Sequence, residues 1–215
     1  MSNHDLPPGE KWRQYELKAL GIRDFARVRL NAPLNPFTLA RFASLLVVDF
    51  DQIRGLSEQA RKHLLGPASE AWSGGAASRP LPNGKRIVIL NPNHGRMRTH
   101  ATLMEEICHV FLGHTANRLS PSADANNGRT IARDYQKADE EAAYAIGAAA
   151  LVPFAALRLF LLQGETSTEI AKYFRVSKQL VEYRLKVTRL WQTYKSGHSE
   201  VPQEQEAGGR SRRTE

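Results

Sequence analysis

The stretch from Ala101 to His114 constrains the fold more than any other part of this 215-residue chain. Its apolar residues recur three and four positions apart, which is the spacing of one face of an α-helix. Gly113 marks the end of the pattern, as glycine commonly does at a helix C-terminus. The sequence therefore predicts an amphipathic helix that packs against a core through Leu103, Ile107, Val110 and Phe111.

Two adjacent carboxylates and an imidazole lie on this helix. Residues four apart stack one turn above the other, so Glu105 and His109 point the same way and Glu106 borders their face. This is the geometry of the zinc-peptidase motif His-Glu-x-x-His, in which two ligands hold a metal and the Glu between them activates a water molecule. Here Glu105 replaces the first His, and a carboxylate is also a zinc ligand. The alternative interpretation is a solvated acidic turn with an incidental His.

The composition narrows the class of protein. An apolar fraction of 41% supports a packed core, and a net charge of +8 favours acidic partners such as nucleic acid. The single cysteine, Cys108, excludes an internal disulfide and favours a reducing compartment. A free cysteine is usually a small buried side chain, so we expect this thiol to be buried. Neighbours on a helix project apart, so we do not expect it to pair with His109. Neither a membrane span nor a signal peptide is predicted, so we expect a cytoplasmic protein.

Local patterns divide the chain into helices around one short hairpin. Asn83-Gly84 between two apolar segments is a hairpin signal, which predicts a small antiparallel sheet immediately before the motif helix. Pro153 ends one long helix and begins the next. The predicted helices span residues 10–20, 36–46, 57–65, 101–113, 132–152 and 154–163, with two more between 166 and 191 and a short strand over 47–50.

These elements predict an α+β protein, mostly helical with a small antiparallel sheet. We expect a flexible leader over residues 1–9 and a main domain over residues 10–163. A C-terminal unit over residues 164–192 and a disordered tail over residues 193–215 follow.

The order of the parts resembles the ImmA/IrrE family of bacterial metallopeptidase-like proteins. The match rests on a hairpin that ends in Ile-Leu-Asn, on the helix with Glu-Glu-x-x-His, and on a second helix that ends in Leu-Val-Pro at Pro153. It extends over residues 36–190. The resemblance implies a zincin-like domain and places a third metal ligand at Glu140, counted back from Pro153. Tyr144 stands where the family has Asn, and Glu141 is the alternative ligand beside Glu140.

The resemblance implies that Glu105, His109 and Glu140 hold a metal and that Glu106 acts as general base. Two carboxylates and one imidazole make a more anionic site than two imidazoles, which weakens the metal as a Lewis acid and admits harder ions. Zinc is the expected cofactor, with manganese or no metal as the alternatives. A slow peptidase, one activated by a partner, or an inactive site would each follow from this ligand set.

Three other histidines need separate interpretations. His94 and His100 lie just before or at the start of the motif helix, and either could replace the missing ligand if the chain folded back. His114 follows Gly113 at the helix end, where a cation favours the helix dipole, so we expect a structural role for it.

The C-terminal unit has the pattern of a helix-turn-helix, whose second helix enters the DNA major groove. Lys178, Gln179 and Lys186 would then contact nucleic acid. Arg175 occupies the turn, where glycine is usual. A packed helical cap without DNA contact is the alternative.

We therefore expect an intracellular ImmA/IrrE-like zinc metallopeptidase that cleaves or regulates a repressor-type transcription factor. That partner class comes from the resemblance. The alternative is a catalytically inactive, metallopeptidase-like regulator that acts by binding protein or DNA.

Overall fold

The computed structural model describes residues 6–77, 79–114 and 137–198 of the chain. Within these ranges the protein is mostly helical, with one small sheet. The helices are α1 (Glu10–Phe25), α2 (Pro36–Phe42), α3 (Glu58–Leu65), α4 (Arg96–Phe111), α5 (Lys137–Leu151), α6 (Phe154–Leu162), α7 (Ser167–Phe174), α8 (Lys178–Val187) and α9 (Trp191–His198), with the 3-10 turns η2 (Phe50–Gln52) and η3 (Ser69–Ala71).

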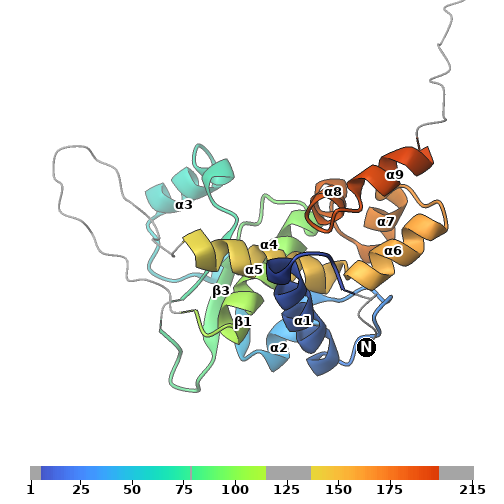
Figure 1. Ribbon diagram of the computed structural model, residues 1–215. Helices are drawn as coiled ribbons and strands as arrows, with labels where there is room; N and C mark the ends of the chain where they lie inside the picture. Colours follow the sequence, from blue (N-terminus) through green and yellow to red (C-terminus); the bar gives the residue numbers. More distant parts are fainter. Residues whose placement is uncertain (1–5, 78, 115–136, 199–215) are drawn as a thin grey trace, which may run out of the picture.

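Helices α4 and α5 form the centre of the molecule. They pack along each other, α1 packs on α5, and α2 packs on α4. Helices α6 to α9 gather on one side of this centre, and α3 lies on the opposite side (Figure 1). The α+β class and the mostly helical character are therefore confirmed.

The sheet has three strands: β1 (Leu45–Val48), β2 (Gly74–Ala76) and β3 (Arg86–Leu90), in the order β1-β3-β2. Strands β2 and β3 pair antiparallel, as the hairpin signal predicts. Strand β1 pairs parallel to β3, so the sheet is mixed instead of wholly antiparallel. A parallel neighbour comes from a distant part of the chain and leaves no turn signal, which is why the local pattern missed it.

A glycine allows the sheet to approach α4 closely. A Cβ atom on Gly74 would lie 2.7 Å from Thr102 Cγ2 on α4 and 3.0 Å from the carbonyl oxygen of Ile89 on β3. These distances are shorter than van der Waals contact, so only glycine fits this position without movement of its neighbours. The motif helix is therefore fixed against the edge strand β2.

Small residues bring α5 against α4. A Cβ atom on Gly147 would lie 3.4 Å from Met104 Cγ and 3.6 Å from Cys108 Sγ, which is ordinary contact. The alanine-rich face of α5 is buried against α4 and α1, with Ala143, Ile146, Ala149 and Ala150 all fully covered. Close packing of these two helices sets the spacing between the side chains that each one carries.

A buried ion pair joins the C-terminal helices to α1. Arg184 Nη2 on α8 lies 2.5 Å from Glu16 Oε2 on α1, and both side chains are almost fully buried. Glu16 Oε1 also accepts a hydrogen bond of 2.6 Å from the backbone N–H of Phe154, the first residue of α6. Arg184 Nε donates to the carbonyl oxygen of Val152 at 3.0 Å. The pair therefore has hydrogen-bond partners on both sides.

Helices α7 and α8 form where the sequence predicts them. Thr166 and Glu169 make a reciprocal capping box at α7, and the Ser177 hydroxyl accepts from the backbone N–H of Leu180 at α8. Arg175 adopts the left-handed conformation between them, with φ 59°. The second helix ends at Val187 instead of near residue 191, and α9 continues to His198, past the expected start of the tail.

Other boundaries also differ from the expectations. Helix α1 runs through Gly21 to Phe25, because Ile22 and Arg23 in the next turn are buried and Arg23 donates to the carbonyl oxygen of Ala150 at 2.6 Å. Helix α2 ends at Phe42, strand β1 starts at residue 45, and α4 begins at Arg96. The expected helical residues 132–136, the first five residues of the leader and the tail after residue 198 lie outside the described ranges.

No single helix in the described ranges combines the length and apolarity needed to cross a bilayer; α5 and α6 meet such a criterion only as a pair, across a bend of 47°.

Candidate metal centre

Helix α4 presents the predicted motif as a compact polar face. Its opposite face is anchored in the core by Leu103, Met104 and Ile107, which are fully buried. That packing fixes the rotation of the helix, so the polar side chains have set directions. Glu106 and His109 are 6% and 5% exposed, and Glu105 is half-buried. A carboxylate and an imidazole with so little contact to water are unusual for a solvated helix face.

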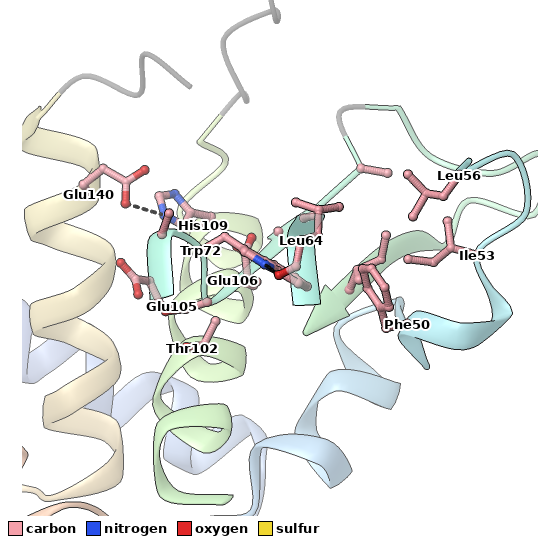
Figure 2. A pocket seen from close by; sticks show the side chains of 17 residues that line it. Phe50, Ile53, Leu56, Leu64, Trp72, Thr102, Glu105, Glu106, His109 and Glu140 are labelled. Carbon is pink, nitrogen blue, oxygen red and sulfur yellow. Dashed lines mark hydrogen bonds and ion pairs between the residues drawn. The ribbon is translucent and has the colours of Figure 1, made fainter. Parts of the chain in front are cut away.

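Helix α5 brings Glu140 to this face. One ligand atom from each of Glu105, His109 and Glu140 lies within 4.8 Å of the others, and among the described residues this is the one such group of three. His109 Nε2 lies 3.7 Å from Glu140 Oε2 (Figure 2). Two carboxylates and one imidazole are donors that zinc accepts, and that harder divalent ions also accept. The three residues therefore fit a divalent metal.

The second nitrogen of His109 has a partner that the sequence analysis did not assign. His109 Nδ1 lies 3.0 Å from His114 Nδ1, and His114 Nε2 lies 3.5 Å from Asp139 Oδ1. A bond between two imidazole nitrogens needs one N–H and one lone pair. If His109 carries its proton on Nδ1, His114 accepts there and turns its own N–H toward Asp139. The lone pair of His109 Nε2 then faces Glu140, as metal ligation requires.

A turn at the end of α4 creates this contact. Gly113 has φ 68°, its N–H donates to the carbonyl oxygen of Val110, and the N–H of His114 donates to the carbonyl oxygen of His109. This pair of bonds is the Schellman motif, in which the residue after the glycine folds back onto the helix. The Gly113-His114 pair was therefore a signal that could have located the second histidine.

The other candidate ligands have different contacts. Glu141 pairs with Lys11 of α1 at 2.5 Å. His94 Nε2 lies 3.4 Å from the Asn91 amide nitrogen, and the ring of His100 packs edge-on against Phe37. None of these three side chains belongs to the group around His109. The structure therefore does not bring His94, His100 or Glu141 to the centre.

Cys108 and Tyr144 lie next to the centre without joining the group of ligands. Cys108 is fully buried, and this burial, followed by the nearby Glu105 carboxylate, raises the pKa of its thiol. A thiol in this environment is not a nucleophile, as expected. Burial and the Glu105 charge also raise the pKa of Tyr144. Its ring packs against the Tyr183 ring, with centroids 5.1 Å apart. Tyr144 is therefore a neutral phenol at the border of the site.

The centre opens into a pocket of about 640 Å³. One side carries Glu105, Glu106, His109 and Glu140, and the backbone of β2 borders it. The other side is apolar, and in Figure 2 Phe50, Ile53 and Leu56 lie at the end of the pocket away from Glu105 and Glu140. This apolar side is formed by Phe50, Ile53, Leu56, Leu64 and Trp72.

The residues predicted to contact nucleic acid are all exposed on α8. Lys178 Nζ lies 3.6 Å from Glu182 Oε1, and Lys186 Nζ lies 5.0 Å from the centre of the Trp191 ring. Gln179 lines a second hollow, together with residues of α4 and with Tyr144 of α5. Their role in DNA contact stays a prediction.

Comparison with known protein families identifies the family to which this chain belongs. The model of the peptidase family described as the IrrE N-terminal-like domain matches residues 69–186, more than half of the chain. The chain belongs to the IrrE N-terminal-like family. The match confirms the predicted resemblance and includes all four residues of the candidate centre, from Glu105 to Glu140. The match starts after α3, so Phe50, Ile53, Leu56 and Leu64 on the apolar side of the pocket precede the matched segment.

Further comparisons add little to this assignment. A search of curated proteins finds no match. Among solved structures, a Mycobacterium tuberculosis transcriptional regulator is similar, with 14% sequence identity and a TM-score of 0.49, over 80% of this chain and 46% of that chain. The chain thus spans less than half the length of that regulator. The similarity is too low to support a conclusion about function.

Proposed function

We propose that this protein is a metal-dependent peptidase whose divalent ion is held by Glu105, His109 and Glu140. The observation that carries the proposal is the convergence of these three side chains within 4.8 Å from two helices. Membership of the IrrE N-terminal-like family, which is a peptidase family, supports the same chemistry. Zinc is the ion that we propose first, and manganese suits the oxygen-rich ligand set as well.

The residues around the centre have separate roles in the proposed reaction. A divalent metal, when bound, supplies Lewis acidity toward a water molecule and a peptide carbonyl. Glu106 takes the proton of the attacking water and returns it to the leaving amine. His114 and Asp139 orient the imidazole of His109, and the apolar side of the pocket excludes water from the reacting bond. The backbone of β2, the edge strand, can pair with an extended substrate chain.

The repressor-type transcription regulator is the substrate class that we propose, on the basis of the family resemblance. A reducing cytoplasm suits both that partner and the single buried cysteine. The second candidate function is a regulator without catalysis on the same scaffold. The observation that favours it is Glu105, because a carboxylate in place of the first His leaves a weaker Lewis acid.

Metal content tests the proposal directly. The protein, purified without chelator and incubated with zinc or manganese, is compared with His109→Ala and Glu140→Ala by elemental analysis. We expect about one ion per chain in the unmodified protein and a loss in both variants. Glu141→Ala is the matched control, since it removes a neighbouring carboxylate that pairs with Lys11 outside the centre. Ion contents that are equal in all four proteins would exclude this ligand set.

Cleavage separates the two candidate functions. In a loaded protein that hydrolyses a repressor or a peptide, Glu106→Gln should lower kcat by about 10²–10⁴-fold and leave the metal content unchanged. A loaded protein without hydrolysis would instead support the regulator. For that regulator, the proposed DNA contact of Lys178, Gln179 and Lys186 is tested by a duplex-DNA shift assay at increasing salt. Neutral variants of Lys178 and Lys186 should reduce the salt dependence, and Gln179→Ala should weaken binding without changing it.

A further inference from the structure

The pocket at the candidate centre has two chemically different sides. The acidic side comes from α4 and α5, whereas the apolar side comes from η2, the segment after it, α3 and the residues before β2. Phe50, Ile53 and Leu56 lie at the end of the pocket away from Glu105 and Glu140 (Figure 2). A volume of about 640 Å³ is within the usual range for sites that enclose a small ligand or one part of a larger one.

The apolar side is built as a preformed surface. The Trp72 indole N–H donates to the carbonyl oxygen of Leu64 at 2.9 Å, which fixes the ring against α3. The Phe50 ring packs on the Trp72 ring, with centroids 5.5 Å apart. Hydrogen bonds and ring contacts therefore hold this surface before any ligand arrives, so that binding requires little ordering of side chains.

An arginine behind this surface fixes its first residues. The Arg61 guanidinium donates to the carbonyl oxygen of Phe50 at 3.0 Å and to that of Ile53, and it lies 5.5 Å from the centre of the Phe50 ring. The Arg61 guanidinium thus holds the backbone of η2 and of the segment after it in place through these hydrogen bonds.

The charges at the opening restrict the ligand. Glu105, Glu106 and Glu140 line the same pocket, so an acidic side chain there would meet like charges. A polar side chain placed against the apolar surface would lose hydrogen bonds to water without replacement. A large apolar side chain suits the surface, and an extended peptide beside β2 would direct alternate side chains to one face.

We propose that the apolar side of this pocket binds a large apolar side chain, such as Leu or Phe, next to the cleaved bond of the peptide substrate. The proposal rests on the proposed function, since it assigns the substrate preference of the same site. It also locates that preference mostly outside the segment that matches the family, at Phe50, Ile53, Leu56 and Leu64.

Two measurements on one peptide series test the preference. The series varies a single position beside the cleaved bond among Leu, Phe, Ala, Glu and Lys. Hydrolysis by the metal-loaded protein gives kcat/KM, and fluorescence polarisation of labelled peptides on metal-loaded Glu106→Gln gives binding without turnover. We expect Leu and Phe to exceed Ala by about tenfold in both, which is the effect of burying a large apolar side chain.

Two substitutions at Leu56 keep the experiment independent of folding defects. Leu56 is half-buried and lines the pocket outside the group of ligands, so Leu56→Ala should reduce the Leu-to-Ala preference at least about threefold while metal content stays the same. Leu56→Lys places a cation on the surface and should raise the relative affinity of the Glu peptide. The matched control is Leu162→Ala on α6, where the side chain is 82% exposed and distant from the pocket.

The outcomes separate this proposal from the proposed function. Hydrolysis without an apolar preference, or a preference that neither Leu56 variant changes, overturns the inference and leaves the peptidase intact. If no peptide or protein is hydrolysed, the proposed peptidase function is wrong. The polarisation data alone then test whether the pocket prefers apolar side chains. Preferential binding of Leu and Phe peptides that Leu56→Lys reverses then supports the apolar surface, and equal binding of all peptides overturns it.

Discussion

The imidazole of His109 has a partner at each of its nitrogens. Nε2 faces Glu140 and Nδ1 faces His114, which in turn reaches Asp139. Ligating histidines are commonly held in this way, because the second nitrogen sets both the tautomer and the orientation of the ring. The carboxylate of Asp139 thus acts on the centre through two imidazole rings.

His114→Ala should therefore weaken metal binding about 10–100-fold, since the Nδ1–H of His109 loses its acceptor. Competition with a chromophoric chelator measures the dissociation constant. His63→Ala is a suitable control, because His63 is exposed on α3 and lies outside the centre. Equal affinities of the His114 and His63 variants would contradict the role of His114.

Glu105→His restores the residue that the zinc-peptidase motif has at this position. It exchanges an oxygen donor for an imidazole, which zinc prefers over manganese. We expect the dissociation constant for zinc to fall at least about tenfold, which corresponds to ~1.4 kcal/mol, and the zinc-to-manganese selectivity to rise. Calorimetric titration with each ion checks this. An unchanged zinc affinity would mean that Glu105 does not ligate.

At the scale of elements, two glycines position α4 and respond oppositely to alanine. Gly74→Ala puts a Cβ atom 2.7 Å from Thr102, so β2 or α4 must shift, and a loss of ~1–3 kcal/mol in the free energy of unfolding is expected. In Gly147→Ala the new Cβ atom on α5 meets only ordinary contacts with α4, of 3.4 Å or more, so the variant should gain up to ~1 kcal/mol from helix propensity. Urea denaturation of both variants measures the difference, and the reverse order would be inconsistent with this packing.

The first turns of α4 should give the protein an acid-sensitive stability. Burial, followed by the charges of Arg96 and Arg175, lowers the pKa of His100 from its usual 6.5. Because the folded state holds the neutral ring, stability is present above the unfolded pKa and falls as the pH drops below 6.5 toward the folded pKa. Urea midpoints across pH 7 to 5 should therefore decline less in His100→Gln than in the unmodified protein. Parallel curves would disprove the contribution of His100.

Local signals predicted most elements, and distant contacts account for what they missed. The Thr166 and Ser177 caps and the Asn83-Gly84 turn lie within a few residues of what they specify. The parallel pairing of β1 depends on a strand about forty residues away, and α1 continues past Gly21 because Arg23 bonds to Ala150. Such contacts leave no mark in a short window of sequence.

The candidate centre was also predicted in part from local signals, and the part that was missed depends on distant contacts. Glu105, Glu106 and His109 were readable from helix spacing, and Glu140 came from the family resemblance. The apolar side of the pocket was not predicted, because Phe50, Leu56 and Trp72 belong to separate segments that only the fold brings together.

At the scale of the whole molecule, the Glu16–Arg184 pair makes the C-terminal helices part of the main fold. Removing one member leaves the other charge buried alone, so Arg184→Leu should cost ~3–5 kcal/mol in the free energy of unfolding. The double variant Glu16→Leu/Arg184→Leu should recover part of this loss, since no charge is stranded. Thermal unfolding of the two proteins measures it. A double variant less stable than the single one would argue against a stranded charge.

Glu16 and Arg184 are 168 residues apart in the chain. Because synthesis starts at the N-terminus, Glu16 leaves the ribosome long before the cation that neutralises it. Until then its carboxylate is better solvated by water than buried. Helix α1 cannot pack on α5 before that, because the residues of α5 also emerge late. Helix α1 is synthesised before the other described helices and is thus among the last of them to be fixed, and a nascent chain that stops before α8 holds an unfinished core.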